Sequence, residues 1–291
     1  MQKPLTLLIL FFSFNVYSQE PCLSGDCENG IGKYLTSGGD LYEGKFKDGL
    51  FEGRGKVIMK DKSIIEGDWK KGLPYQGNMV FLNGDKYVGE IADFNAHGKG
   101  KYLFTNGNIY IGEFAHGKCS GKGKLFYKNG ARYEGDFLFN NLYGNGIMFY
   151  PSGSNYTGKF IDGKAQGEGV FKSNLGIYTG QWFKDKYQGK GIYKYTNGDI
   201  YTGDWVEGLC HGQGTMIYKN GNKYIGSYLK GQKAGKGKWI SSSGIVYDGN
   251  FSNGVKNGEG VITYSDGRKE KGIGDNQCKQ KKTVTNRTTT K

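Results

Sequence analysis

The chain has 291 residues, of which 52 are glycine, 22 tyrosine, 17 phenylalanine and only 4 proline, and its formal net charge is +13. Collagen would need glycine at every third position with abundant proline, and a flexible linker would lack the tyrosines, so the composition excludes both. A hydrophobic fraction of 36% argues against a deep globular core and favours a thin structure of repeated strands and turns.

Residues 1–18 have the pattern of a signal peptide. Lys3 supplies a positive charge, Leu5 to Val16 is an apolar run, and Val16-Tyr17-Ser18 approximates a small-x-small cleavage site. The alternative is a membrane anchor, but the run is shorter than the ~20 residues that span a bilayer. We therefore expect a cleaved signal and a mature protein that is secreted, periplasmic or exposed on the cell envelope.

Residues 19–278 form a predicted repeat array with a period of 23 residues, shortened twice to 22. Ten full repeats run from 42 to 269, and a partial unit lies at each end. Most repeats open with Tyr-x-Gly, and their first residues are Tyr42, Ile65, Tyr87, Tyr110, Tyr133, Tyr156, Tyr178, Tyr201, Tyr224 and Tyr247.

Each repeat has the pattern of a β-hairpin. In the unit that begins at Tyr201, alternate residues up to Trp205 are aromatic or glycine, which is the period-two pattern of a strand with one buried face. A turn at residues 207–209 leads to a second alternating strand, residues 212–218. The sequence thus predicts an all-β, elongated, single-layer solenoid of tandem antiparallel hairpins.

The connection between repeats carries a turn signal. Asn220-Gly221 predicts a two-residue type I′ turn, in which both central residues have positive φ. The same signal recurs at Asn83-Gly84, Asn106-Gly107, Asn129-Gly130, Asn197-Gly198 and Asp266-Gly267.

The glycines are expected to make room for aromatic rings. Alternation places Gly203, Gly212 and Gly214 on the same face as Tyr201 and Trp205, so the rings can lie over bare backbone. We interpret the aromatic rows as core and not as a ligand platform.

One unit, Tyr110-Ile111-Gly112-Glu113-Phe114-Ala115-His116-Gly117 continuing to Gly121-Lys122-Gly123, closely resembles the MORN (membrane occupation and recognition nexus) repeat. The resemblance covers residues 42 to 269 and implies sheets of successive hairpins. The second unit departs from it, with Ile65 in place of Tyr, and a widened turn or bend is expected between Gly72 and Gly77.

The resemblance also implies how such arrays act. In the family, MORN arrays accompany lipid kinases, junctional membrane proteins, cytoskeletal scaffolds and a histone methyltransferase domain, and the chemistry comes from another domain. The repeats here fill the chain between the signal and the tail, so we expect no enzyme and no cofactor.

The histidines and cysteines do not form a predicted metal site. His97 and His211 share one repeat position, whereas Cys119 and Cys210 are four repeats apart, ~40 Å at ~4.8 Å per strand. These are expected to be solvated turn residues. Near the mature N-terminus, Cys22 and Cys27 are candidates for a disulfide, with two free thiols as the alternative.

The positive charge of the array is expected to be partly neutralised by acidic residues. The pattern predicts cross-strand pairs Glu90–Lys99, Glu113–Lys122 and Glu43–Lys56 on the face opposite the aromatics. Residues 279–291 are expected to be a disordered basic tail. The candidate surface-binding residues are Lys99, Lys101, Lys122, Lys124, Lys190, Lys236, Lys238, Lys279, Lys281 and Lys282.

These observations favour a non-catalytic repeat scaffold that binds a protein partner. A peripheral binder of anionic lipid or envelope polymer is the alternative, supported by the basic tail and by the family's association with membranes. An enzyme is a third, less favoured reading. We expect no nucleic-acid partner, because the basic stripe is partly neutralised by acidic residues.

Overall fold

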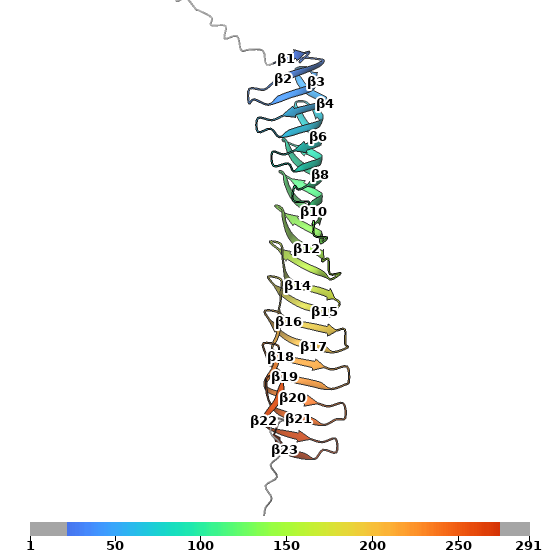
Figure 1. The fold of residues 1–291 in the computed structure, drawn as a ribbon, viewed down its shortest axis with the longest axis vertical. Helices are drawn as coiled ribbons and strands as arrows, with labels where there is room; N and C mark the ends of the chain where they lie inside the picture. Colours follow the sequence, from blue (N-terminus) through green and yellow to red (C-terminus); the bar gives the residue numbers. More distant parts are fainter. Residues whose placement is uncertain (1–21, 274–291) are drawn as a thin grey trace, which may run out of the picture. The chain divides into compact units, whose positions relative to one another are not determined.

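The computed structural model describes residues 22–273, and the regular secondary structure of this part is entirely β-strand. It divides into two units at residues 118 and 119. Within each unit every strand pairs antiparallel with the next one along the chain (Figure 1). Each unit is therefore a single-layer sheet of consecutive hairpins, which confirms the predicted all-β hairpin solenoid.

The strands are short and similar in length. The first unit contains β1 (Cys22–Gly25), β2 (Ile31–Leu35), β3 (Leu41–Lys47), β4 (Leu50–Ile58), β5 (Ile64–Lys70), β6 (Leu73–Val80), β7 (Lys86–Ala92), β8 (Asn95–Leu103) and β9 (Ile109–Ala115). The division falls at the start of β10 (Lys118–Phe126). The second unit continues with β11 (Arg132–Leu138), β12 (Asn141–Phe149), β13 (Asn155–Ile161), β14 (Lys164–Ser173), β15 (Gly176–Phe183), β16 (Lys186–Tyr195), β17 (Ile200–Val206), β18 (Leu209–Ile217), β19 (Lys223–Leu229), β20 (Gln232–Ile240), β21 (Val246–Ser252), β22 (Val255–Thr263) and β23 (Lys269–Ile273).

The tyrosine that opens a repeat is the centre of its hairpin. Tyr201 is fully buried, and its Oη donates a hydrogen bond of 2.9 Å to the backbone carbonyl of Asp204. At this point β17 and β18 form a bulge, because the register shifts between Gly203 and Asp204. The phenol thus gives a carbonyl at the bulge a buried partner. The same bond is made by Tyr42, Tyr87, Tyr110, Tyr133, Tyr156, Tyr178, Tyr224 and Tyr247.

A pair of glycines lies beneath each tyrosine ring. Gly203 faces Gly214 across the hairpin, and a Cβ added to Gly214 would lie 2.5 Å from the Oη of Tyr201. The predicted role of these two glycines is therefore confirmed. The prediction for Gly212 is wrong: it has a φ of +55°, and its added Cβ would meet Asp204 on the opposite face. The bulge is the reason, since it interrupts the alternation of the second strand.

The aromatic rows form the core of each unit. Tyr201 meets Trp205 of its own hairpin edge to face, with ring centroids 5.1 Å apart. It meets Tyr228 of the next hairpin in the same way, at 5.1 Å. Edge-to-face contacts of this kind are the favoured geometry for aromatic pairs, so each hairpin stabilises the next.

The two turns of the repeat are the reverse of the prediction. Glu207 and Gly208, inside the hairpin, both have positive φ and connect Val206 directly to Leu209, so the type I′ geometry belongs here. At the predicted position Gly221 alone has positive φ. There the N–H of Tyr218 donates to the carbonyl of Asn222, leaving a three-residue loop. Asn220 instead accepts the N–H of Asn222 through its side chain, a local turn that Asn favours.

The second repeat has a smaller bulge than the other repeats, and its turn is not widened. Lys70 faces Leu73 across the two-residue turn that other repeats also have, so the expected widening is wrong. The register shift between Asp68 and Trp69 leaves one unpaired residue on β6, against two in the repeat of Tyr201. With one bulge residue fewer, this repeat is one residue shorter. Ile65 has no hydroxyl for the usual bond to a bulge carbonyl.

Candidate functional site

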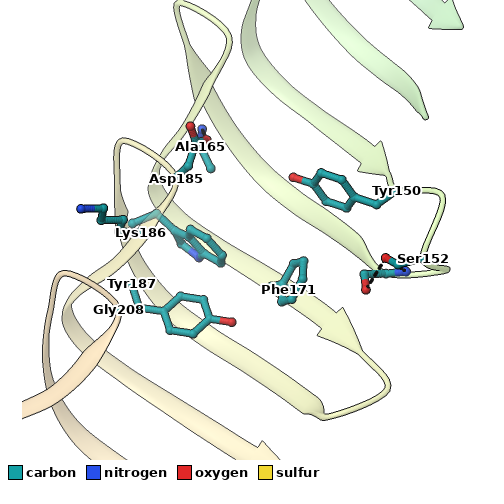
Figure 2. A pocket seen from close by; sticks show the side chains of 10 residues that line it. Tyr150, Ser152, Ala165, Phe171, Asp185, Lys186, Tyr187 and Gly208 are labelled. Atoms are coloured by element: carbon teal, nitrogen blue, oxygen red, sulfur yellow. Dashed lines mark hydrogen bonds between the residues drawn. The ribbon is translucent and has the colours of Figure 1, made fainter. Parts of the chain in front are cut away.

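A hollow of about 460 Å³ opens on the aromatic face of the second unit. Tyr150, Phe171, Trp182 and Tyr187 form its walls, and Asp185 and Lys186 lie at its rim. Figure 2 shows Tyr150, Phe171 and Tyr187 around this space, with Ser152 beyond Tyr150. The volume falls in the range of ordinary ligand sites, roughly 300 to 1,000 Å³. We take it as a candidate binding site and call it the aromatic hollow.

The hollow exists because one repeat lacks two large side chains. Ala165 faces Phe160 at a position where the neighbouring hairpins have Leu142 and Tyr187. At the end of β14 this repeat has Ser173, whereas the equivalent positions of the repeats on either side are Tyr150, directly after β12, and Tyr195, the last residue of β16. Ala165 lines the hollow directly, whereas Ser173 lies at the other end of β14, beside the connection to the next repeat.

A shorter connection accompanies this loss. Ser173 pairs directly with Gly176, so only two residues link β14 to β15. This accounts for the 22-residue spacing between Tyr156 and Tyr178. The spacing was visible in the sequence, and it is the signal that could have located the hollow, which sequence analysis missed.

The polar groups of the hollow differ in how well they are paired. The indole N–H of Trp182 donates to the carbonyl of Gly169 at 3.2 Å, and Lys186 forms an ion pair with Glu207. Asp185 Oδ1 accepts the backbone N–H of Ala165 at 2.8 Å. Among the described residues, the hydroxyls of Tyr150 and Tyr187 have no hydrogen-bond partner.

Burial raises the pKa of both phenols, which are neutral at pH 7 even without this shift. It raises the pKa of Tyr187 well above its ordinary value, with smaller contributions from Tyr193 and Tyr195. Burial also raises the pKa of Tyr150, and the negative charge of Asp185 adds to the shift. At neutral pH both groups are therefore hydroxyls that can donate as well as accept.

The lysines of the predicted basic stripe belong to both units. Lys122 pairs with Asp136, Lys190 with Asp204, Lys124 with Glu134 at 3.1 Å, and Lys238 with Asp248 at 3.3 Å. Within residues 22–273, Lys99, Lys101 and Lys236 form no ion pair. Neighbouring carboxylates thus neutralise the charge of four of the seven array lysines in the predicted stripe.

Two of the three predicted cross-strand pairs are wrong. Lys99 faces Glu113 of the next hairpin and not Glu90, and Lys122 faces Asp136 and not Glu113. The bulge shifts the register inside each hairpin, so Glu90 accepts the backbone N–H of Lys99 instead, at 2.9 Å. Glu43 does face Lys56 as predicted.

The repeat pattern was compared with known proteins. A family model for the MORN repeat matches residues 42–63, 94–109, 110–132, 133–155, 156–174, 178–200, 201–223, 224–246 and 247–267. The chain belongs to the MORN repeat family. The stretch from 64 to 93, which includes the repeat with Ile65 and the smaller bulge, has no match in this comparison.

Among solved structures, this MORN chain is similar to the TCP10 domain of Danio rerio CPAP in complex with a peptide of Danio rerio STIL. The identity is 11%, with 82% of this chain and 92% of that chain covered and a TM-score of 0.35. It is also similar to the SAS-4 (dCPAP) TCP domain of Drosophila melanogaster in complex with a proline-rich motif of Ana2. The identity there is 14%, the coverage 61% and 85%, and the TM-score 0.27. We base no functional conclusion on likenesses this weak. No curated protein matches the chain.

The remaining cysteines and histidines of the MORN array are not brought together as a metal site. No group of three or more His, Cys, Asp or Glu residues within 22–273 could hold a metal ion. The prediction that Cys119 and Cys210 are solvated is wrong, because both are buried. Burial raises their thiol pKa values to about 12 and about 11. His97 and His116 approach each other, with ring centroids 6.2 Å apart.

The N-terminal end of the described MORN array carries a disulfide. This disulfide joins Cys22, the first residue of β1, to Cys27. The predicted signal peptide, residues 1–18, and the tail residues Lys279, Lys281 and Lys282 lie outside the described residues. In the described part of the chain, no helix has the length and apolar character needed to cross a membrane.

Proposed function

We propose that this MORN chain is a non-catalytic scaffold that binds partner proteins outside the cytoplasm. The aromatic hollow carries the proposal, because it is a concave apolar site in which, among the described residues, two tyrosine hydroxyls have no hydrogen-bond partner. Repeat arrays commonly bind partners through extended surfaces of this kind. Aromatic residues are also enriched in the buried centres of protein interfaces.

Export is the second part of the proposal. It is supported by the signal-like residues 1–18 and by the Cys22–Cys27 disulfide, since disulfides persist mainly in oxidising compartments. Mass spectrometry of the protein from its native cells tests both features. We expect a mature N-terminus at residue 19 or 20 and a mass that includes the bond. An uncleaved protein in the cytoplasmic fraction would contradict export.

The binding function is tested with the mature chain as bait in an envelope extract from the native cells. We expect one or a few proteins to be retained in stoichiometric amount by the folded bait and not by heat-unfolded bait. A defined complex reconstituted from purified components completes the test. If only lipid is retained, and no protein binds after reconstitution, the scaffold proposal is wrong.

The alternative of binding an anionic lipid or envelope polymer through the array is less favoured. Four lysines of the basic stripe are already paired with carboxylates, and an ion-paired lysine offers little net charge to an anionic surface. Sedimentation of the mature protein with anionic vesicles separates this alternative from protein binding.

A further inference from the structure

The shape of the aromatic hollow indicates what is missing from it. In the repeats before and after, large side chains occupy the positions of Ala165 and Ser173. The rings that border the gap therefore lack the neighbouring side chain that the equivalent rings of other repeats contact. Tyr150 retains 41% exposure at its edge. Four aromatic rings, those of Tyr150, Phe171, Trp182 and Tyr187, therefore surround a gap that Leu142 or Tyr187 would fill in a neighbouring repeat.

The rings around the gap are held in fixed positions. Tyr187 stacks on Tyr178 with ring centroids 3.8 Å apart and meets Trp182 edge to face at 4.7 Å. Phe171 lies 6.2 Å from both Tyr150 and Trp182. These contacts between wall rings lie within the spacing that aromatic pairs prefer, about 4.5 to 7 Å, so the walls of the hollow are held in place before a ligand enters. Preorganised walls also reduce the entropy lost on binding.

The charges at the rim restrict the sequence around such a side chain. Lys186 is neutralised by Glu207, whereas Asp185 has no cation among its described partners. The rim therefore carries one uncompensated negative charge. An acidic segment would be repelled, while a neutral or basic segment would be accepted or attracted.

We propose that the aromatic hollow binds an aromatic side chain presented by a neutral or basic segment of a partner protein. This inference rests on the proposed scaffold function and specifies the chemistry of one of its sites. The partner's ring completes the aromatic row of the second unit, and the hydroxyls of Tyr150 and Tyr187 are available to carbonyl groups of the partner's backbone.

The first experiment uses three small probes with the mature protein. Binding of N-acetyltryptophanamide, N-acetylleucinamide and N-acetylglucosamine is followed by backbone amide NMR shifts. We expect the tryptophan probe to shift signals of Ser152, Ala165 and Gly208, with a dissociation constant on the order of 0.1 to 1 mM. The other two should bind at least ~10-fold more weakly, since neither carries an aromatic ring. Equal or tighter binding of leucine or sugar would overturn the inference.

A variant that fills the gap supplies the matched test. Ala165→Tyr introduces the residue that the next repeat has at Tyr187, so the fold already accommodates a tyrosine at this position. We expect the tryptophan probe to lose at least ~10-fold in affinity. Thr179→Tyr, an exposed position on the opposite face, is the control and should bind as the unmodified protein does. Unchanged binding by a folded Ala165→Tyr protein would refute the site.

If Ala165→Tyr does not fold, Tyr150→Ala replaces it, because Tyr150 is half exposed and belongs to the wall. It should weaken the tryptophan probe by a similar factor, and full retention of binding would refute the site.

The charge preference is tested with the blocked tetrapeptides Gly-Trp-Lys-Gly and Gly-Trp-Glu-Gly. We expect the lysine peptide to bind more tightly, by about 3-fold or more at low salt, and Asp185→Asn to abolish the difference. Preference for the glutamate peptide would overturn the charge assignment.

If the chain captures a defined protein but binds no aromatic probe, the scaffold function stands and the assignment of this hollow fails. If the probes bind and no protein complex forms, the scaffold function fails.

Discussion

At the scale of single residues, the repeat is organised around one hydroxyl and two missing side chains. The buried Tyr201 needs a partner for its Oη, and the carbonyl of Asp204 at the bulge supplies it. The ring reaches this carbonyl only because Gly203 and Gly214 have no Cβ in its path. Tyrosine, glycine pair and bulge therefore depend on one another, which explains why they recur together.

The glycine pair gives a direct test of this dependence. Gly214→Ala would place a Cβ 2.5 Å from Tyr201 Oη, so we expect a loss of about 1 to 3 kcal/mol in unfolding free energy through overpacking. Gly38→Ala is the control, since its nearest neighbour would be 3.7 Å away and the change should stay within about 0.5 kcal/mol. Urea denaturation measures both, and equal shifts would mean that the ring contact is unimportant.

At the scale of the hairpin, alternation and glycine spacing were enough to predict the strands. What they could not predict was the consequence of the bulge. A two-residue bulge moves Gly212 to the outer face and sends the side chain of Lys122 to the next hairpin. The sequence contains no mark that distinguishes a bulged glycine from a paired one, so the register was assigned as if the strands were regular.

The candidate site shows the same limit. The 22-residue spacing between Tyr156 and Tyr178 was recognised as an irregularity of the period. Its meaning depends on the neighbouring hairpins, because a small residue creates a hollow only where the adjacent side chains cannot fill the space. Ala165 lies between hairpins with fixed aromatic contacts, so the gap stays open.

The glycine that ends the loop between two repeats is needed only because its backbone has a positive φ. Gly130 has a φ of +88°, and no atom lies within 4 Å of an added Cβ. We therefore expect Gly130→Ala to cost about 1 to 2 kcal/mol from the left-handed conformation, without any clash. Gly130→Asn should cost less, because Asn tolerates this conformation better than Ala. Thermal unfolding compares the two, and an equal or larger loss for Asn would contradict this account.

At the scale of the whole chain, the repeated tyrosine bond makes the fold sensitive to alkali. Burial raises the pKa of Tyr42, Tyr87 and Tyr224 to about 12, above the ~10 of an exposed phenol in the unfolded chain. The folded state favours the protonated phenol. The stability contributed by these groups is therefore fully present below pH ~10 and is lost as the pH rises through about 12.

Alkaline titration should accordingly show cooperative unfolding above pH ~10, detected by circular dichroism together with tyrosinate absorbance. The two signals should change together, because buried phenols ionise only as the hairpins open. Repeating the titration in high salt controls for exposed ion pairs, which salt weakens, and should leave the midpoint unchanged. Most tyrosines ionising near pH 10 with the sheet intact would contradict the prediction.

The basic residues at the end of the sequence provide a test of charge-driven binding. Lys279, Lys281, Lys282, Arg287 and Lys291 follow the last carboxylate, Asp275, whereas several lysines of the array are paired with acidic side chains. If the mature protein binds anionic vesicles, deletion of residues 279–291 should remove most of that binding. Raising the salt should weaken the binding of the intact protein, because exposed charges are screened within ~8 Å at physiological ionic strength.

The melting temperature of the truncated protein serves as the control and should not change, since the last described strand ends at Ile273. Full vesicle binding by the truncated protein would instead point to the array. In that case Lys101 and Lys236 become the residues to replace first, because neither is held by an ion pair within residues 22–273 and each can offer its charge to an anionic surface. Loss of binding in the double variant Lys101→Ala/Lys236→Ala would then place the contact on the repeats and not on the tail.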